Sequence, residues 1–297
     1  MQLIDKKVII LDGDITKEQL GLDKKSYLEV LQNVTTVINS AANVKHFVKP
    51  EQIKKDNVLS VNYLIDFCGT QKTLAHISTL SIAGFKGDLT NNKSFDENTL
   101  FINQDFNSNP YLISKFEAEK NILKATNTKN LNAIIFRLGN IMPRASDGVF
   151  QINANQNVFL VSLKAILDSQ VVAKDFLGLN LEFSPVDECS NIILNLLENC
   201  DSQSIYHVLS DKEITISELK TLLKFLNCDI LEVDLKTFID ELSKHADEYS
   251  KEYILSNNLN AYTQDLTMQK MKSLGLEWSS IDVSYMQKVL DIIQKLD

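Results

Sequence analysis

The feature that most constrains the fold is a set of short, continuous apolar runs, each of which ends in polar residues. Four such runs lie in the first half of the chain, at residues 8–11, 35–38, 74–77 and 133–136. Runs of this length are typical of strands that are buried on both faces. Stretches of helical length, such as residues 57–68 and 111–126, lie between them. This alternation predicts a doubly wound α/β fold with a parallel sheet.

The second half of the chain has a different pattern. After about residue 145 an Asn- and Gln-rich loop at 151–157 is followed by helical stretches and a few short apolar runs, such as residues 205–208. Apolar residues recur at helical spacing at Leu219, Leu222, Leu223 and Leu226, which predicts a helix packed against a core. We therefore expect two regions: residues 1–145, which carry the parallel sheet, and residues 146–297, a smaller, mostly helical substrate-binding region.

Charge and composition exclude several classes of function. The net charge of -9 argues against nucleic acid as a partner, because nucleic-acid binders gather Lys and Arg on one face. No apolar stretch approaches the roughly 20 residues that span a bilayer, and the N-terminus lacks the order of a signal peptide. We expect a cytoplasmic protein that does not enter a membrane. The four cysteines and four histidines show no metal-binding spacing, so we predict no metal site.

Tyr111 and Lys115 stand one helical turn apart, at positions i and i+4 of a predicted helix. Pro110 is typical of a helix start, so both side chains are expected on one face. Free tyrosine has a pKa of about 10, and a nearby ammonium group lowers that pKa by stabilising the phenolate. Thr79, which follows an apolar run, supplies a neutral hydroxyl suited to holding a substrate carbonyl oxygen. The three residues suit carbonyl reduction with hydride from a cofactor.

A Tyr-x-x-x-Lys pattern alone is weak evidence, because many exposed helices contain one by chance. Here it lies between two predicted strand ends, the first at Thr79 and the second at residues 137–140. In doubly wound sheets, ligands bind beyond the carboxyl ends of the strands, which is where these residues fall. The context therefore favours a catalytic centre over a chance pattern.

Three segments resemble a known family: HISTLSIAG at 76–84, NPYLISKFEAEK at 109–120 and RLGNIMPR at 137–144. Together they are similar to the extended short-chain dehydrogenase/reductases, and within these to the thioester reductase domains of nonribosomal peptide synthetases and carboxylic acid reductases. Residues 147–153 also look like this family's segment after the nicotinamide loop. The likeness runs from about residue 8 to at least residue 215.

The resemblance implies an enzyme that uses NADPH, with NAD not excluded, to reduce an acyl or peptidyl thioester on the phosphopantetheine arm of a carrier protein. The product is an aldehyde or an alcohol. Thr79 and Tyr111 would hold and protonate the oxygen, while Lys115 would bind the nicotinamide ribose and lower the pKa of the tyrosine. The implied cofactor-binding residues are Asp14, Ile15, Ala41, Ala42, Asn57, Lys115, Gly139, Asn140 and Ile141.

One element of the family pattern has no counterpart in the sequence. The family opens with a glycine-rich loop that binds the cofactor pyrophosphate at a helix N-terminus, whereas none of the nine glycines here forms G-x-G-x-x-G. Asn39 also stands where the family usually has histidine. We therefore expect residues 1–145 to form a partial, N-terminally truncated Rossmann-like domain.

Two alternatives remain open. The chain could be a catalytically silent fragment of such a domain, which retains the fold but cannot hold a dinucleotide. It could also be a different extended short-chain reductase that acts on a nucleotide sugar, since those enzymes share the tyrosine and the lysine.

Overall fold

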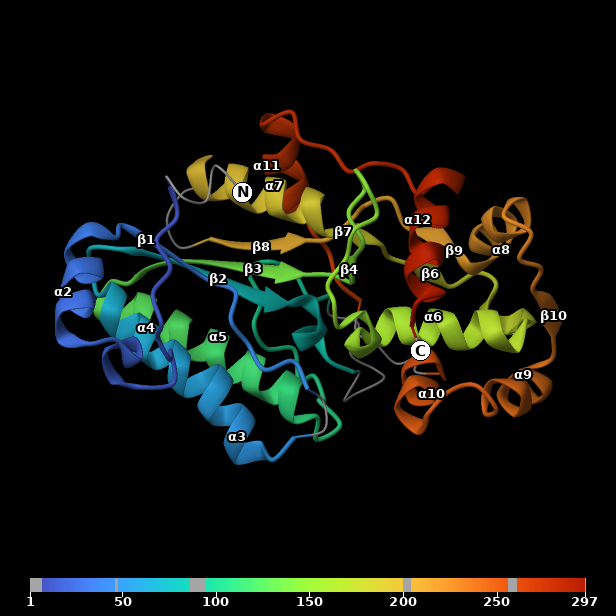
Figure 1. Ribbon diagram of the computed structural model, residues 1–297, viewed down its shortest axis with the longest axis horizontal. Coiled ribbons are helices and arrows are strands. Elements are labelled where there is room, and N and C mark those ends of the chain that lie inside the picture. The colour runs from blue at the N-terminus through green and yellow to red at the C-terminus, as the bar shows by residue number, and fades with distance from the viewer. Residues whose placement is uncertain (1–6, 46–47, 86–93, 200–203, 256–260, 297) are drawn as a thin grey trace. The chain divides into compact units, whose positions relative to one another are not determined.

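The computed structural model describes residues 7–45, 48–85, 94–199, 204–255 and 261–296. The chain divides into two compact units, shown in Figure 1. Unit 1 consists of Met1–Arg137, Leu197–His207 and Asn260–Leu266, and unit 2 of Leu138–Leu196, Val208–Leu259 and Thr267–Asp297. Neither unit is continuous in sequence. A single boundary near residue 145 therefore does not foresee that two later segments join the first unit.

Unit 1 is built on a parallel sheet of four strands in the order β1-β2-β3-β8. The strands are β1 (Thr36–Asn39), β2 (Thr73–Thr79), β3 (Asn132–Leu138) and β8 (Ile205–Val208). β1 pairs with β2 in parallel, with Thr36 opposite Thr73 and Asn39 opposite His76. The predicted parallel α/β fold is thus confirmed, and three of the four apolar runs in the first half of the sequence form its strands.

The fourth run, residues 8–11, was expected to be a buried strand, and this prediction is wrong. The segment has no secondary structure, and Ile9 and Ile10 are each 84% exposed. A strand is stable only when a neighbour satisfies its backbone N–H and C=O groups, and among the described residues this segment has no such ladder. An apolar run reveals a preference for burial but does not reveal whether a neighbour is available.

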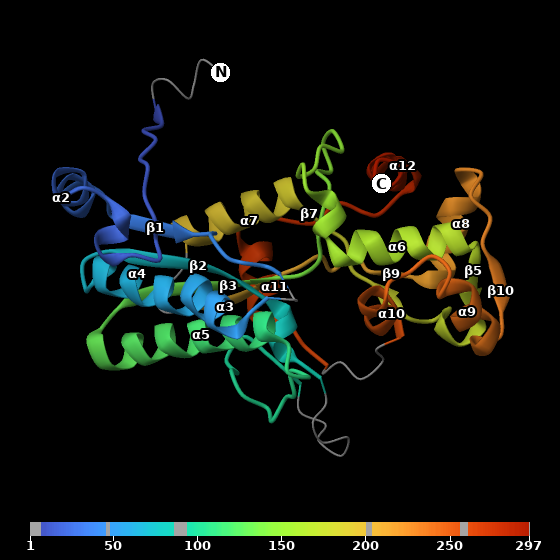
Figure 2. The same ribbon diagram turned by 60° about the horizontal axis from the view of Figure 1, so that its bottom comes forward.

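Helices α4 (Ser60–Cys68) and α5 (Pro110–Lys129) lie side by side along the sheet in Figures 1 and 2. Their inner faces form a core with β2 and β3, in which Ile122 and Ala118 of α5 and Leu74 of β2 are fully buried. Burial stabilises side chains of the size of Ile122 and Leu74 by roughly 1.5–3 kcal/mol each. The remaining elements of unit 1 are η1 (Glu18–Gly21), α2 (Lys24–Asn33), α3 (Pro50–Lys54), η2 (Lys55–Leu59) and η3 (Leu80–Ala83).

Unit 2 has a separate core, formed mainly by α6 (Val158–Ser169), α8 (Ile216–Phe225) and α12 (Val283–Ile293) around the parallel pair β5 (Val171–Ala173) and β10 (Leu231–Val233). The helix predicted from the leucine spacing is α8. The other elements that lie wholly or mainly in unit 2 are β4 (Ile141–Met142), η4 (Ala154–Gln156), η5 (Lys174–Phe176), β6 (Asn180–Leu181), β7 (Ser184–Pro185), α7 (Val186–Asn199), β9 (Ile214–Thr215), α9 (Leu235–Leu242), α10 (Glu248–Leu255) and α11 (Asp265–Ser273).

Within the described residues, no helix combines the length and the apolar character needed to cross a membrane.

Candidate active site

The start of α5 positions Tyr111. Asn109 caps the helix: its Oδ1 accepts hydrogen bonds from the backbone N–H groups of Tyr111 at 3.0 Å and Leu112 at 3.3 Å. Pro110 occupies the first helical position, where a missing N–H costs nothing. The predicted helix start is confirmed, and it fixes the backbone of Tyr111 in the first turn.

Thr79 is the last residue of β2 and caps the short helix η3, since its Oγ1 accepts a hydrogen bond from the Ser81 N–H at 3.2 Å. The Thr79 side chain also shares a hydrogen bond with the Tyr111 hydroxyl. Two residues that lie far apart in sequence are therefore brought into direct contact at the carboxyl end of a central strand.

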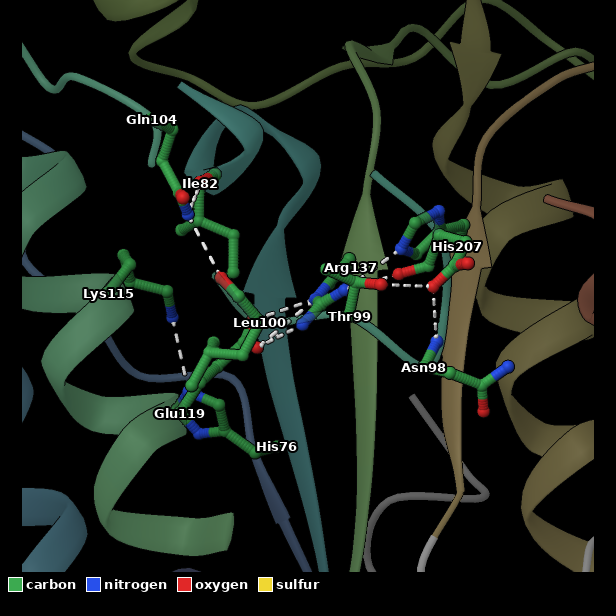
Figure 3. Close-up of polar contacts among 11 residues, drawn as sticks. His76, Ile82, Asn98, Thr99, Leu100, Gln104, Lys115, Glu119, Arg137 and His207 are labelled. Carbon is green, nitrogen blue, oxygen red and sulfur yellow. Dashed lines mark hydrogen bonds and ion pairs between the residues drawn. The ribbon is translucent and has the colours of Figure 1, made fainter. Parts of the chain in front are cut away.

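Lys115 lies one turn further along α5 and is almost fully buried, at 3% exposure. Its Nζ donates a hydrogen bond to the Ile77 carbonyl oxygen at 2.7 Å and lies 3.4 Å from Nε2 of His76. Figure 3 draws the contact between Lys115 and His76. Burial lowers the pKa of Lys115 to about 8, while the charge of Glu119 acts in the opposite direction. The side chain is held against β2 near Tyr111 and Thr79.

The pKa of Tyr111 differs from the expectation. We expected the ammonium group of Lys115 to lower it, but burial of the phenol raises the pKa to about 12, and the hydrogen bond from Thr79 offsets only part of this rise. The physical reason is that the free-energy cost of removing a phenolate from water exceeds the stabilisation that the neighbouring dipoles provide. Tyr111 is therefore a neutral phenol at pH 7, the form that can donate a proton.

Behind Lys115 lies a buried polar network that the sequence did not reveal (Figure 3). The Arg137 guanidinium group forms an ion pair with Glu119 at 2.9 Å, and both side chains are fully buried. Arg137 also donates to His207 Nε2 at 3.1 Å and lies over the Phe95 ring, 4.4 Å from its centre. Burial and the charge of Arg137 lower the pKa of His207 to about 3, so the imidazole is a neutral acceptor. The network ties α5 to β3 and β8.

The residues predicted to contact the adenine and the middle of the cofactor lie in unit 1. The Asp14 carboxylate accepts hydrogen bonds from the Thr16 N–H at 2.9 Å and the Thr16 hydroxyl at 2.7 Å, and these lower its pKa to about 2. Ile15 is half-buried beside it. Ala41 and Ala42 are exposed just after the carboxyl end of β1. All four residues are at least partly exposed, so each is accessible to a ligand.

Asn57 is buried, and its amide group is used within the protein. Its Oδ1 accepts from the Asn43 N–H at 2.7 Å, and its Nδ2 donates to the Asn43 carbonyl oxygen and to Ser114 Oγ, both at 2.9 Å. Because both N–H donors are occupied, Asn57 holds the loop after β1 against α5. This arrangement favours a positioning role over a direct contact with the cofactor.

Gly139, Asn140 and Ile141 follow β3 and belong to unit 2. The Asn140 N–H donates to the Glu182 carboxylate at 2.5 Å, and a Cβ at residue 139 would overlap both that carboxylate and the Cβ of Leu209, which favours glycine there. Glu182 is 7% exposed and accepts a further hydrogen bond from Ser184, and burial raises its pKa to about 7. Sequence reasoning missed Glu182. Its position as a carboxylate between the apolar residues Leu181 and Phe183 is the signal that could have revealed it.

The chain has relatives of known sequence and structure. It is 27% identical over 262 residues to "Probable polyketide synthase 38" of Dictyostelium discoideum. The aligned part covers 83% of this chain and 8% of that protein. "Probable polyketide synthase 39" of the same organism is 26% identical, with the same coverage. The chain thus spans only about a twelfth of the length of these curated relatives.

Solved structures show the same fold. A thiolation-reductase di-domain from an archaeal non-ribosomal peptide synthetase matches with a TM-score of 0.84 and 28% identity, covering all of this chain and 64% of that one. The terminal R domain of the myxalamid PKS-NRPS pathway matches with a TM-score of 0.82 and 17% identity, over all of this chain and 78% of that one. The predicted likeness to terminal reductase domains is confirmed. Residues 1–193 match the family described as Male sterility protein, and because this match spans more than half of the 297 residues, the chain belongs to that family.

Proposed function

We propose that this chain is an NADPH-dependent reductase of an acyl or peptidyl thioester carried on the phosphopantetheine arm of a carrier protein. The observation that carries the proposal is the hydrogen-bonded pair of Thr79 and Tyr111 at the carboxyl end of β2, with Lys115 one turn further along α5. The relatives named above support this substrate class, since they include a thiolation-reductase di-domain.

The residues present fit a nicotinamide cofactor in part. Within unit 1, Lys115, Asp14 and the exposed residues Ala41 and Ala42 would hold it. The sequence contains no glycine-rich loop for the pyrophosphate. When bound, the cofactor supplies a hydride to the carbonyl carbon of the thioester.

The chain's own residues orient the carbonyl oxygen of the thioester and supply its proton. Thr79 and Tyr111 orient the carbonyl oxygen by hydrogen bonds, and Tyr111 donates a proton to that oxygen as negative charge develops on it. The resulting hemithioacetal then returns its O–H proton to the Tyr111 phenolate as its C–S bond breaks with the electron pair on sulfur. The thiolate takes a proton from water, which leaves an aldehyde and the free thiol. Lys115, as an ammonium, stabilises the tyrosinate that forms when the proton leaves.

The direct test is NADPH oxidation in the presence of an acyl-pantetheine thioester, with the aldehyde and the released thiol identified. We expect consumption of NADPH in step with the thioester and none with uridine diphosphate sugars. Turnover of the sugar nucleotide in place of the thioester would instead establish the nucleotide-sugar alternative.

A second candidate is the catalytically silent fragment that the sequence left open, which the terminal reductase domains among the solved relatives do not favour. Calorimetric titration with NADPH distinguishes the two candidates. The reductase proposal predicts binding in the micromolar range, which contradicts a silent fragment. Absence of heat at millimolar NADPH, with the chain shown to be folded by circular dichroism, would establish the silent fragment.

A further inference from the structure

Three polar side chains from different elements of unit 1 form a buried chain of contacts: Asn39 of β1, His76 of β2 and Lys115 of α5. They are 5%, 2% and 3% exposed. Asn39 Nδ2 lies 3.1 Å from His76 Nδ1, and Lys115 Nζ lies 3.4 Å from His76 Nε2. β1 and β2 place the first two side by side, since Asn39 is directly opposite His76 in the parallel ladder.

Proton counting limits how these contacts can be made. An ammonium group only donates hydrogen bonds, so a charged Lys115 requires that Nε2 of His76 is unprotonated and can accept one. A neutral imidazole then carries its proton on Nδ1, which must find an acceptor. Asn39 provides that acceptor only if its amide group is turned so that Oδ1 faces the ring, and the two ends of an amide are distinguished by such networks. The alternative places the proton on Nε2 and requires a neutral Lys115.

The surroundings of Lys115 favour the first arrangement. Its Nζ also donates to the Ile77 carbonyl oxygen at 2.7 Å, and two acceptors stabilise the ammonium form. Glu119, one turn along α5, adds a negative charge, but its carboxylate is paired with Arg137. Burial and the charge of Lys115 hold the pKa of His76 well below its ordinary range, so the imidazole stays neutral. Of the three ammonium N–H groups, these described contacts use two.

We propose that His76, oriented by Asn39, is a positioning residue that holds Lys115 in place as an ammonium group and leaves its third N–H for a ligand. The inference rests on the proposed function, in which that ligand is the ribose of the nicotinamide cofactor. The His76 ring acts through Lys115 and touches no reacting atom.

The first test is independent of activity. Nitrogen-15 NMR of the full chain reports which ring nitrogen of His76 carries the proton, and carbon-13 NMR of Lys115 reports its pKa. We expect the Nδ1–H form from pH 5 to 8. In His76→Leu, which removes the acceptor, the pKa of Lys115 should fall from about 8 to about 7 or below. His76→Gln keeps an acceptor and should retain the wild-type value.

Two results would overturn the proposal: an Nε2–H tautomer in the wild type, or an unchanged Lys115 pKa in folded His76→Leu. If His76→Leu does not fold, Asn39→Leu serves instead. It removes the Nδ1–H acceptor, so the Nε2–H form should become detectable, and its absence would contradict the role given to Asn39.

A second readout separates this inference from the proposed function. In the wild type, kcat/KM for NADPH should decline at alkaline pH as Lys115 loses its proton. In His76→Leu, this decline should begin at a hydroxide concentration about tenfold lower than in the wild type. In His76→Gln, it should begin at the wild-type concentration. An unshifted profile in active His76→Leu would refute the positioning role. No NADPH oxidation by the wild type, with the expected tautomer present, would refute the proposed function alone.

Discussion

At the scale of single residues, burial decides the charge states at the candidate site. Burial raises the pKa of Tyr111 to about 12 and lowers that of Lys115 to about 8, so each group is displaced toward its neutral form. Tyr111 is a neutral phenol at pH 7, the form that the proposed function requires of a proton donor, while Lys115 stays mainly charged because His76, Ile77 and Glu119 favour the ammonium. The assignment of the proton donor therefore follows from burial rather than from a lowered tyrosine pKa.

Glu182 gives a prediction about stability and pH. Its pKa is about 7 in the folded chain and 4.5 without burial, so folding favours the protonated carboxyl group. The contribution is fully present below pH 4.5 and is lost as the pH rises through 7, on the order of 3 kcal/mol in unfolding free energy. Glu182→Gln mimics the protonated group and should flatten this fall. Urea denaturation of both proteins between pH 4.5 and 8 measures the difference, and parallel curves would contradict the prediction.

At the scale of elements, α5 contacts the sheet through polar side chains at two points along its length. Near its start the Tyr111 hydroxyl contacts Thr79 of β2, and further along Glu119 contacts Arg137 of β3. Ion pairs that are fully desolvated contribute little net stability, but each partner alone is costly to leave buried. The ion pair therefore sets the position of α5, and with it the positions of Tyr111 and Lys115.

This ion pair yields a prediction for a double-mutant cycle. Glu119→Leu and Arg137→Met should each lower the unfolding free energy by about 3–5 kcal/mol, because one charge is left unpaired. The double variant should lose much less than the sum, since neither charge remains. Chemical denaturation of the four proteins supplies the measurement. Additive losses would show that the two side chains do not act as a pair.

The sequence predicts much at this scale. Apolar runs located β1, β2, β3 and β8, and Pro110 located the start of α5. The prediction of a strand at residues 8–11 was wrong because an apolar run does not reveal whether a neighbouring strand exists. The contacts of His76 with Lys115 and of Glu182 with Asn140 were also missed, since each joins residues about 40 positions apart and leaves no local periodicity.

At the scale of the whole molecule, the chain has two separate cores. Ile122 belongs to the core of unit 1 and Leu160 to that of unit 2, and both are fully buried. The sequence indicates two regions but not their composition, because residues 197–207 and 260–266 return to unit 1 through contacts distant in sequence. Sequence pattern identifies elements better than it assigns them to units.

The separate cores predict localised effects of core mutations. Ile122→Ala and Leu160→Ala should each cost about 2–5 kcal/mol, through lost burial and the cavity left behind. Hydrogen exchange should rise in β2, β3 and α5 for Ile122→Ala, and in α6, α8 and α12 for Leu160→Ala. Mass spectrometry of deuterated fragments measures this pattern. An equal rise in both sets of elements from either variant would contradict it.

The central claim is that Tyr111 delivers the proton in reduction of a thioester. The most direct measurement is the single-turnover rate of NADPH oxidation with saturating acyl-pantetheine thioester, for the wild type and for Tyr111→Phe. The phenyl ring keeps the packing but has no proton to give, so we predict a rate lower by about 10²–10⁴-fold with NADPH affinity unchanged. Equal rates for the two proteins would contradict the account.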